Sequence, residues 1–101
     1  MAHAQPDTAR IHKCPSNQIR VWVDTIAVAP VHVGASRAHT VLGTYSFGQE
    51  LCRDDKAMNP HEGIFYYHVV NPAGNSSTGQ KITGWIDCYF LKPNNAQECG
   101  R

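Results

Sequence analysis

Apolar and polar residues alternate along several short runs of this chain, and no run has the spacing of an amphipathic helix. Residues 19–28 (IRVWVDTIAV) place Ile19, Val21 and Val23 on one side of an extended segment, which is typical of a half-buried strand. Residues 64–70 (IFYYHVV) have the strongest β character, because all but one of them are β-branched or aromatic. We therefore expect a strand in both segments.

Shorter runs of the same kind lie between segments that contain glycine, proline and asparagine. Strand character is found in residues 31–33, 41–47, 50–53 and 81–86. Residues 87–91 (DCYFL) predict a single 3₁₀ turn that Pro93 ends. About five or six short strands at roughly ten-residue spacing predict an all-β fold, a small antiparallel barrel or sandwich.

Polar segments separate these runs and flank them. Residues 53–63 (RDDKAMNPHEG) and 71–80 (NPAGNSSTGQ) predict long surface loops. The chain divides accordingly into a polar N-terminal tail (1–18), a β domain (19–91) and a C-terminal tail (92–101) that a disulfide through Cys99 ties down.

Length and charge limit the class of protein. A chain of 101 residues fits one domain with a modest core. The formal net charge of +1 removes the electrostatic reason to expect nucleic acid or an anionic membrane surface as a partner. No apolar run approaches the length that crosses a bilayer. We expect a monomer that does not insert into membranes.

Four cysteines bear on the compartment: Cys14, Cys52, Cys88 and Cys99. They are even in number and widely spread, and no pair has C-x-x-C spacing, which predicts disulfides in a secreted domain. Buried free thiols and a metal site are the alternatives. The residues alone leave the connectivity open. Residues 1–10 (MAHAQPDTAR) lack the apolar stretch of a signal peptide, so we expect the mature form of an extracellular protein.

Segments in this order resemble the bacterial SH3-like domains known as SH3b. They are residues 31–40 (VHVGASRAHT), 41–51 (VLGTYSFGQEL) and 79–91 (GQKITGWIDCYFL). The last segment, with its Gly-Trp pair and closing Phe-Leu, is the most specific. Residues 66–69 (YYHV) stand where the family usually has Trp-Tyr-x-Val. The match covers most of the chain.

The resemblance implies a small SH3-like barrel and a recognition unit rather than an enzyme. Its register directs Tyr67 and Val69 into the core and leaves Tyr66 and His68 near the surface. Domains of this family typically bind peptidoglycan peptides or protein segments. The implied function is therefore that of a binding module, secreted or attached to the cell envelope.

Cys52 ends its predicted strand, as a cysteine does in secreted actinobacterial members of the family. Those members often carry a second cysteine near the end of the module. The resemblance therefore implies that Cys52 pairs with Cys88 or Cys99.

Aromatic residues in the second half of the chain carry the candidate ligand site. Tyr66 and Phe90 stand at positions by which SH3-like grooves often contact ligands, and with Tyr89 they would stack on a peptide or sugar. His68 shares a strand face with Tyr66, and Asp54 offers a carboxylate to a cationic or amide-rich ligand. The alternatives are aromatic residues that only fill the core and acidic residues that are simply solvated.

Signals for catalysis and metal binding are weak. A pair such as Cys88 and His68 would suit a thiol nucleophile only with a free cysteine. The six histidines lack metal-ligand spacing, although His32 and His68 would meet if their strands were neighbours. We expect no enzyme activity, no cofactor and no metal. The expected ligand is a peptide, peptidoglycan or a protein; the alternative is a secreted inhibitor or protein-binding domain that uses loops 53–63 and 71–80.

Overall fold

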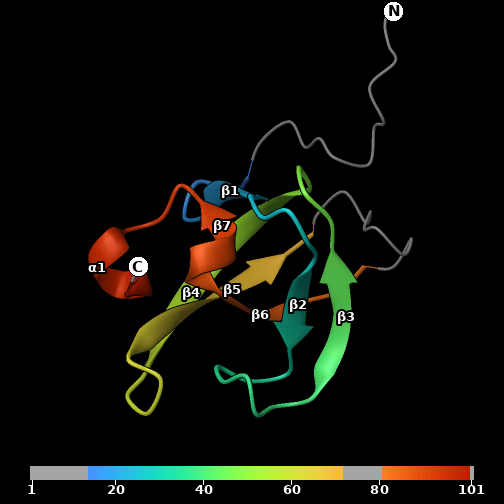
Figure 1. Cartoon of the computed structure of the whole chain (residues 1–101). Helices are drawn as coiled ribbons and strands as arrows, with labels where there is room; N and C mark the ends of the chain where they lie inside the picture. Colours follow the sequence, from blue (N-terminus) through green and yellow to red (C-terminus); the bar gives the residue numbers. More distant parts are fainter. Residues whose placement is uncertain (1–13, 72–80, 101) are drawn as a thin grey trace, which may run out of the picture.

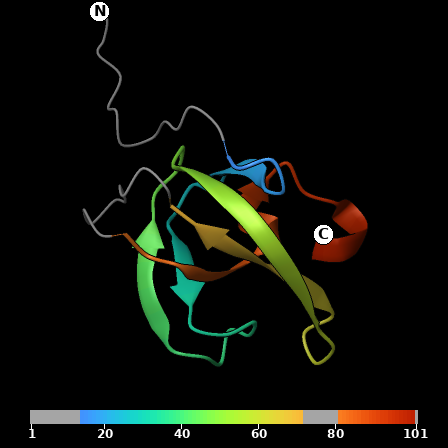
Figure 2. The same ribbon diagram turned by 180° about the vertical axis from the view of Figure 1, so that it is seen from behind.

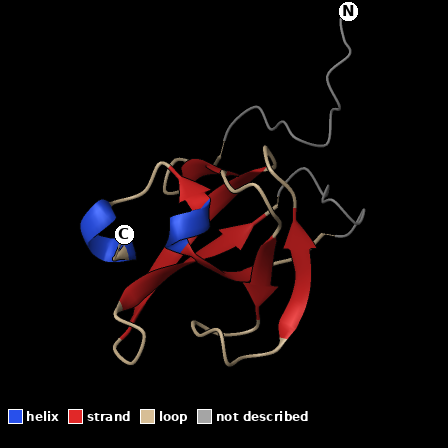
Figure 3. Ribbon diagram, in the orientation of Figure 1, coloured by secondary structure: helices blue, strands red, loops and turns tan. Residues whose placement is uncertain are grey.

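The computed structural model describes residues 14–71 and 81–100 (Figures 1 and 3). Residues 1–13 of the predicted N-terminal tail, residues 72–80 of the predicted loop and residue 101 lie outside this part. The strands are β1 (Ile19–Val23), β2 (Ala29–His32), β3 (Val41–Tyr45), β4 (Glu50–Asn59), β5 (Ile64–Val70), β6 (Gly84–Asp87) and β7 (Leu91–Lys92). The 3₁₀ turn η2 (Cys88–Phe90) and the helix α1 (Ala96–Cys99) complete the elements.

All strand pairs are antiparallel, and the strands form one sheet in the order β3-β2-β6-β5-β4-β1-β7. The sheet is strongly curved, as the two opposite views show (Figures 1 and 2). Its outermost strands, β3 and β7, do not pair with each other within the described residues, so the sheet is not closed into a barrel. The prediction of an all-β antiparallel fold is confirmed, and so is the 3₁₀ turn within residues 87–91.

The predicted loop over residues 53–63 is wrong for most of its length. Strand β4 continues to Asn59 and pairs with β5 from Cys52 onward. Asp54, Asp55 and Lys56 of this strand are exposed, so their charges stay in water while the backbone completes the ladder with β5. The chain reverses just after Asn59, where Gly63 has a φ of +74° that suits glycine.

Strand β6 depends on a glycine to lie against β2. A Cβ atom at Gly84 would lie 2.6 Å from the carbonyl oxygen of His32. The next residue, Trp85, is in register with His32 on one side and with His68 on the other. The Gly-Trp pair therefore fixes where β6 crosses the middle of the sheet.

The core is built from one face of the sheet, and Tyr67 and Val69 belong to it, as the resemblance implied. The Tyr45 hydroxyl also lies in the interior. It donates a hydrogen bond to the carbonyl oxygen of Ile82 at 2.6 Å and accepts one from its N–H at 3.1 Å. Burial raises the pKa of Tyr45 in spite of these bonds.

Two disulfides join the four cysteines, Cys14–Cys52 and Cys88–Cys99, with Cα–Cα distances of 5.6 and 5.5 Å. The predicted disulfides are therefore confirmed. The pairing of Cys52 with Cys88 or Cys99 that the resemblance implied is wrong. Cys52 lies in β4 in register with Arg20 of β1, so the segment just before β1 reaches it.

The C-terminal tail expected at residues 92–101 contains the helix α1 (Figure 1). The Asn95 side chain caps it by accepting hydrogen bonds from backbone N–H groups of its first turn. Glu98 attaches the helix to the sheet, because it accepts a hydrogen bond from the Tyr67 hydroxyl at 2.7 Å. Cys99 ties this segment down, as predicted. The sequence pattern did not predict this helix, because a helix of four residues is too short to show a hydrophobic period.

Candidate functional site

A cleft of 310 Å³ opens where β2, β5 and β6 meet the loop after β2 and the turn η2. It combines aromatic and apolar walls with charged groups, a composition typical of ligand sites. The residues that line it are Pro30, His32, Arg37, Glu62, Ile64, Tyr66, Asp87 and Phe90.

Tyr66 lies at the bottom of this cleft. It points away from the core residue Tyr67, because successive side chains of β5 alternate between the two faces of the sheet. Tyr66 is nevertheless only 1% exposed, so the surface position that the resemblance implied is wrong. Its ring meets the His32 ring edge-on at 6.1 Å, and its hydroxyl donates a hydrogen bond to Glu62.

Glu62 holds the loop after β2 against the β4–β5 turn. Its Oε2 accepts hydrogen bonds at 3.0 Å from the Ser36 hydroxyl and from the Arg37 backbone N–H, while Oε1 accepts the bond from Tyr66. Burial by itself would raise the pKa of Glu62, but these hydrogen bonds and the charge of Arg37 bring the pKa below its ordinary value. The carboxylate therefore stays ionised and fixes one rim of the cleft.

Charges of both signs face the cleft. The Arg37 side chain is largely exposed, with Nε 3.8 Å from Oε1 of Glu62. The Asp87 carboxylate accepts a hydrogen bond from the Tyr89 backbone N–H at 2.9 Å and so starts η2. Burial, the hydrogen bond and charge of Glu62, and the charge of Asp87 together raise the pKa of Tyr66. The Tyr66 hydroxyl therefore stays protonated at neutral pH and donates its hydrogen bond to Glu62.

The predicted aromatic groove is divided between two clefts. Phe90 forms a wall of the Tyr66 cleft. Tyr89 is 45% exposed and packs edge-on against Phe90, with the ring centroids 5.8 Å apart. It lines a neighbouring cleft of 470 Å³ together with Ile26 and Lys92. Tyr66 and Phe90 are thus brought together, and Tyr89 extends the aromatic surface beyond them.

Asp54 and His68, the other predicted ligand residues, contact each other outside the Tyr66 cleft. Nδ1 of His68 lies 2.6 Å from Oδ1 of Asp54, and the Trp85 ring packs on the His68 ring at 4.9 Å. The register of β4 shifts between Arg53 and Asp55, which turns Asp54 toward His68. Asp54 therefore lies in a strand rather than a loop, and the pair links β4 to β5.

Sequence reasoning missed the charged residues Arg37, Glu62 and Asp87 and gave His32 no role in ligand binding. Glu62 lies in a segment expected to be solvated, and its bond to Ser36 spans 26 residues, so no local pattern reveals it. The suggested meeting of His32 and His68 does not occur, because Trp85 is in register between them.

Three other possibilities concern a thiol nucleophile, a metal site and a membrane-spanning helix. Cys88 is bonded to Cys99, so it is not a thiol nucleophile beside His68. Within residues 14–71 and 81–100, no group of three or more His, Cys, Asp or Glu residues is arranged to hold a metal ion. None of the helices in the described part of the chain has the length and apolar character needed to cross a membrane.

Comparison with family models, curated proteins and solved structures finds no match to this chain. The function of the cleft around Tyr66 is therefore inferred from the residues that line it.

Proposed function

We propose that this protein is a non-enzymatic binding module that takes an extended peptide, or a peptide of the cell wall, in the Tyr66 cleft. The observation that carries the proposal is the construction of the cleft. Phe90 and Pro30 supply apolar walls, and the ionised Glu62 holds one rim in place. Apolar surface with a few fixed polar groups is what peptide-binding grooves use.

Each part of the cleft would make a different contact. Phe90 offers its ring to apolar or planar groups of the ligand. Tyr66 shapes the cleft from beneath, because its side chain is buried and its hydroxyl is bonded to Glu62. Arg37 stands at the rim with its side chain 77% exposed, and its guanidinium would donate to peptide carbonyl groups.

We also assign the curved sheet to an SH3-like arrangement of the SH3b type. In favour of this, η2 and β7 directly follow β6; β6 and η2 lie in the segment 79–91 that carries the resemblance, and β7 begins at its last residue, Leu91. A secreted or cell-envelope location is supported by the two disulfides, because such bonds persist mainly in oxidising compartments.

Sedimentation with insoluble bacterial cell walls tests the wall-binding form of the proposal. We expect the protein to co-sediment, and Phe90→Ala to lower its affinity about fivefold or more. Because Phe90 packs against the core, Arg37→Ala serves as a second variant that leaves the core intact. Trp22→Ala, which removes a half-exposed aromatic ring that does not line the cleft, is the matched control. Protein that stays in the supernatant with several wall types excludes wall binding.

A second candidate function, binding of one specific protein partner, is favoured by exposed apolar residues on two connections. Ile26 is fully exposed between β1 and β2, and Phe47 is 66% exposed between β3 and β4. The connections lie together, because the Gly48 N–H donates a hydrogen bond to the Val23 carbonyl oxygen at 2.8 Å. Exposed apolar groups at neighbouring loops are typical of protein-binding surfaces.

An affinity pull-down from culture medium separates the two functions. If the connections bind a partner, the wild type and Phe90→Ala retain one stoichiometric protein, and the double variant Ile26→Asp, Phe47→Asp loses it. If the partner is lost with Phe90→Ala and kept by the double variant, the Tyr66 cleft is the protein-binding site instead.

A further inference from the structure

A separate cleft, of 270 Å³, lies between β4 and the C-terminal segment and shares no residue with the Tyr66 cleft. One side is formed by β1 and β4, and the other by the residues that lead into α1. Its main contributors are Ile19, Arg53, Lys56, Tyr67, Pro93 and Glu98.

The guanidinium of Arg53 is held in this cleft by an aromatic ring. Its Cζ atom lies 4.4 Å from the centroid of the Tyr67 ring, a cation–π geometry that fixes the plane of the group. Tyr67 is fully buried, so the Arg53 group covers its ring. Within residues 14–71 and 81–100 the guanidinium makes this ring contact, and its charge acts on the Glu98 carboxylate without a hydrogen bond or a close ion pair between the two. Its donors are therefore available to a ligand.

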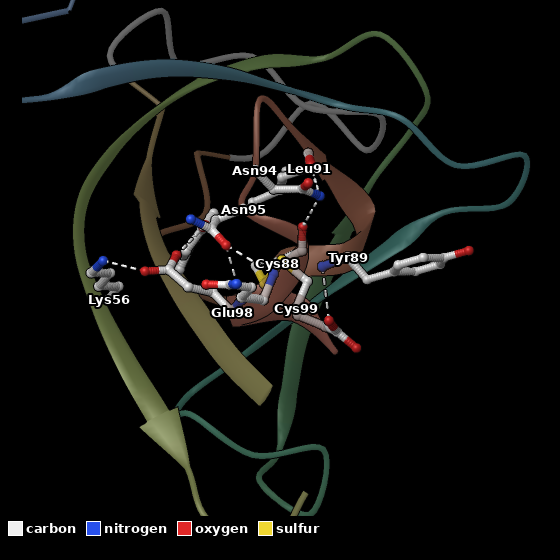
Figure 4. The surroundings of a disulfide bond; sticks show 11 residues. Lys56, Cys88, Tyr89, Leu91, Asn94, Asn95, Glu98 and Cys99 are labelled. Atoms are coloured by element: carbon white, nitrogen blue, oxygen red, sulfur yellow. Dashed lines mark hydrogen bonds and ion pairs between the residues drawn. A yellow bond between two sulfur atoms is a disulfide. The ribbon is translucent and has the colours of Figure 1, made fainter. Parts of the chain in front are cut away.

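The other charges of the cleft neutralise each other. Nζ of Lys56 contacts Oε2 of Glu98 in an ion pair (Figure 4). The hydrogen bonds from Lys56 and from the Tyr67 hydroxyl lower the pKa of Glu98. Glu98 is therefore ionised at neutral pH and balances Lys56. The charge of Arg53 also lowers the pKa of Glu98, and the two cations with one carboxylate leave the lining of the cleft with a net positive charge.

Two neighbouring acidic groups, Asp54 and Asp55, already accept hydrogen bonds. Asp54 accepts from His68, and the Asp55 carboxylate accepts a hydrogen bond from the Lys56 backbone N–H at 2.7 Å. Both line an adjacent hollow of 140 Å³, which shares Ile19, Arg53 and Lys56 with this cleft. Apolar surface is supplied beside Arg53 by Ile19, which is half exposed, and by Pro93.

We propose that this cleft binds a carboxylate carried on an apolar body, with the Arg53 guanidinium as its anchor. A planar guanidinium matches the two oxygens of a carboxylate in a paired hydrogen-bond geometry. The apolar body packs against Ile19 and Pro93. A peptide C-terminus and a free carboxylic acid share this chemistry.

Amide NMR titration at constant ionic strength tests the carboxylate requirement. N-acetyl-leucine is expected to shift the backbone signals of Arg53, Lys56 and Tyr67. N-acetyl-leucine amide has the same body without the charge and is expected to leave them in place. A leucine-terminated dipeptide that binds more tightly than N-acetyl-leucine would identify peptide C-termini as the source, and equal affinity a free acid. Equal shifts by the acid and its amide would overturn the proposal.

Variants of Arg53 test the anchor. Arg53→Gln is expected to weaken binding of N-acetyl-leucine about tenfold or more, because it removes a charge-assisted hydrogen-bond pair. Arg53→Lys keeps the charge without the planar fork, so an intermediate loss is expected. Arg20→Gln is the control for a lost positive charge on the neighbouring strand. Thermal unfolding establishes that each variant is folded. Unchanged affinity in Arg53→Lys or Arg53→Gln would overturn the proposal.

Discussion

The buried hydroxyl of Tyr66 donates a hydrogen bond to the carboxylate of Glu62, across the turn that joins β4 to β5. The same carboxylate accepts hydrogen bonds from Ser36 and from the backbone of Arg37. One ionised side chain thus connects β5, the β4–β5 turn and the loop after β2. The shape of the Tyr66 cleft depends on that connection.

Replacing Glu62 should destabilise the protein as well as open the cleft. Glu62→Gln lacks the charge that four donors share, so we expect a loss of about 2 to 3 kcal/mol in the free energy of unfolding. Tyr66→Phe removes one of these bonds and should cost about 1 to 2 kcal/mol. Urea unfolding measures both values. Glu50→Gln, which changes an ion pair with the exposed Arg20, is the control and should cost less than about 1 kcal/mol. Equal losses for Glu50→Gln and Glu62→Gln would contradict the central role of Glu62.

Acid should weaken the protein through Glu62 and Glu98. Both carboxyl groups have a pKa below the ordinary value, because donors hold their charged forms. Their contribution is present above the pKa of the unfolded chain, about 4.3, and is lost as the pH falls through the lower folded values. Urea unfolding at neutral pH and at successively lower pH below about 4.3 should show this decline. The double variant Glu62→Gln, Glu98→Gln should decline less steeply over that range; an identical slope would assign acid sensitivity to other groups.

Some elements follow directly from the sequence because one local pattern decides them. Strand β5 has the bounds predicted at residues 64–70, since its β-branched and aromatic residues leave little choice. Strand β4 was predicted only over residues 50–53, because the charged residues that follow suggest a loop. Charged residues are compatible with a strand when their side chains face water. That residues 54–59 form a strand is decided by their pairing with β5, which is distant information for a local pattern.

The candidate site was predictable only in part for a similar reason. Tyr66 and Phe90 were found from their aromatic character and from a family resemblance. The buried position of Tyr66 depends on Glu62 and on the loop after β2, contacts that composition and alternation do not encode. The disulfide partner of Cys52 likewise follows from β1 lying beside β4, which the sequence alone leaves open.

Alkali should weaken the protein through its buried tyrosines. Burial raises the pKa of Tyr45, and burial together with a neighbouring carboxylate raises the pKa values of Tyr66 and Tyr67. These groups stabilise the fold below the unfolded value of about 10, and the contribution is lost as the pH rises through the higher folded values. Absorbance near 295 nm should show that Tyr45, Tyr66 and Tyr67 ionise later in the folded protein than in urea. Tyr66→Phe should remove one late ionisation. Ionisation of these three tyrosines near 10 in the folded state would contradict the effect of their burial.

The two disulfides should contribute unequally to stability. Cys14–Cys52 closes a separation of 38 residues and Cys88–Cys99 one of 11. In the chain-entropy model, disulfides that close loops of these lengths stabilise the folded protein by about 4 and about 3 kcal/mol respectively. Urea unfolding of Cys14→Ser, Cys52→Ser and of Cys88→Ser, Cys99→Ser should therefore show the larger loss in the first variant. The mass of the unreduced protein, about 4 Da below the reduced chain, checks that both bonds are present. A larger loss in the second variant would show that native contacts of α1, rather than loop closure, determine the effect.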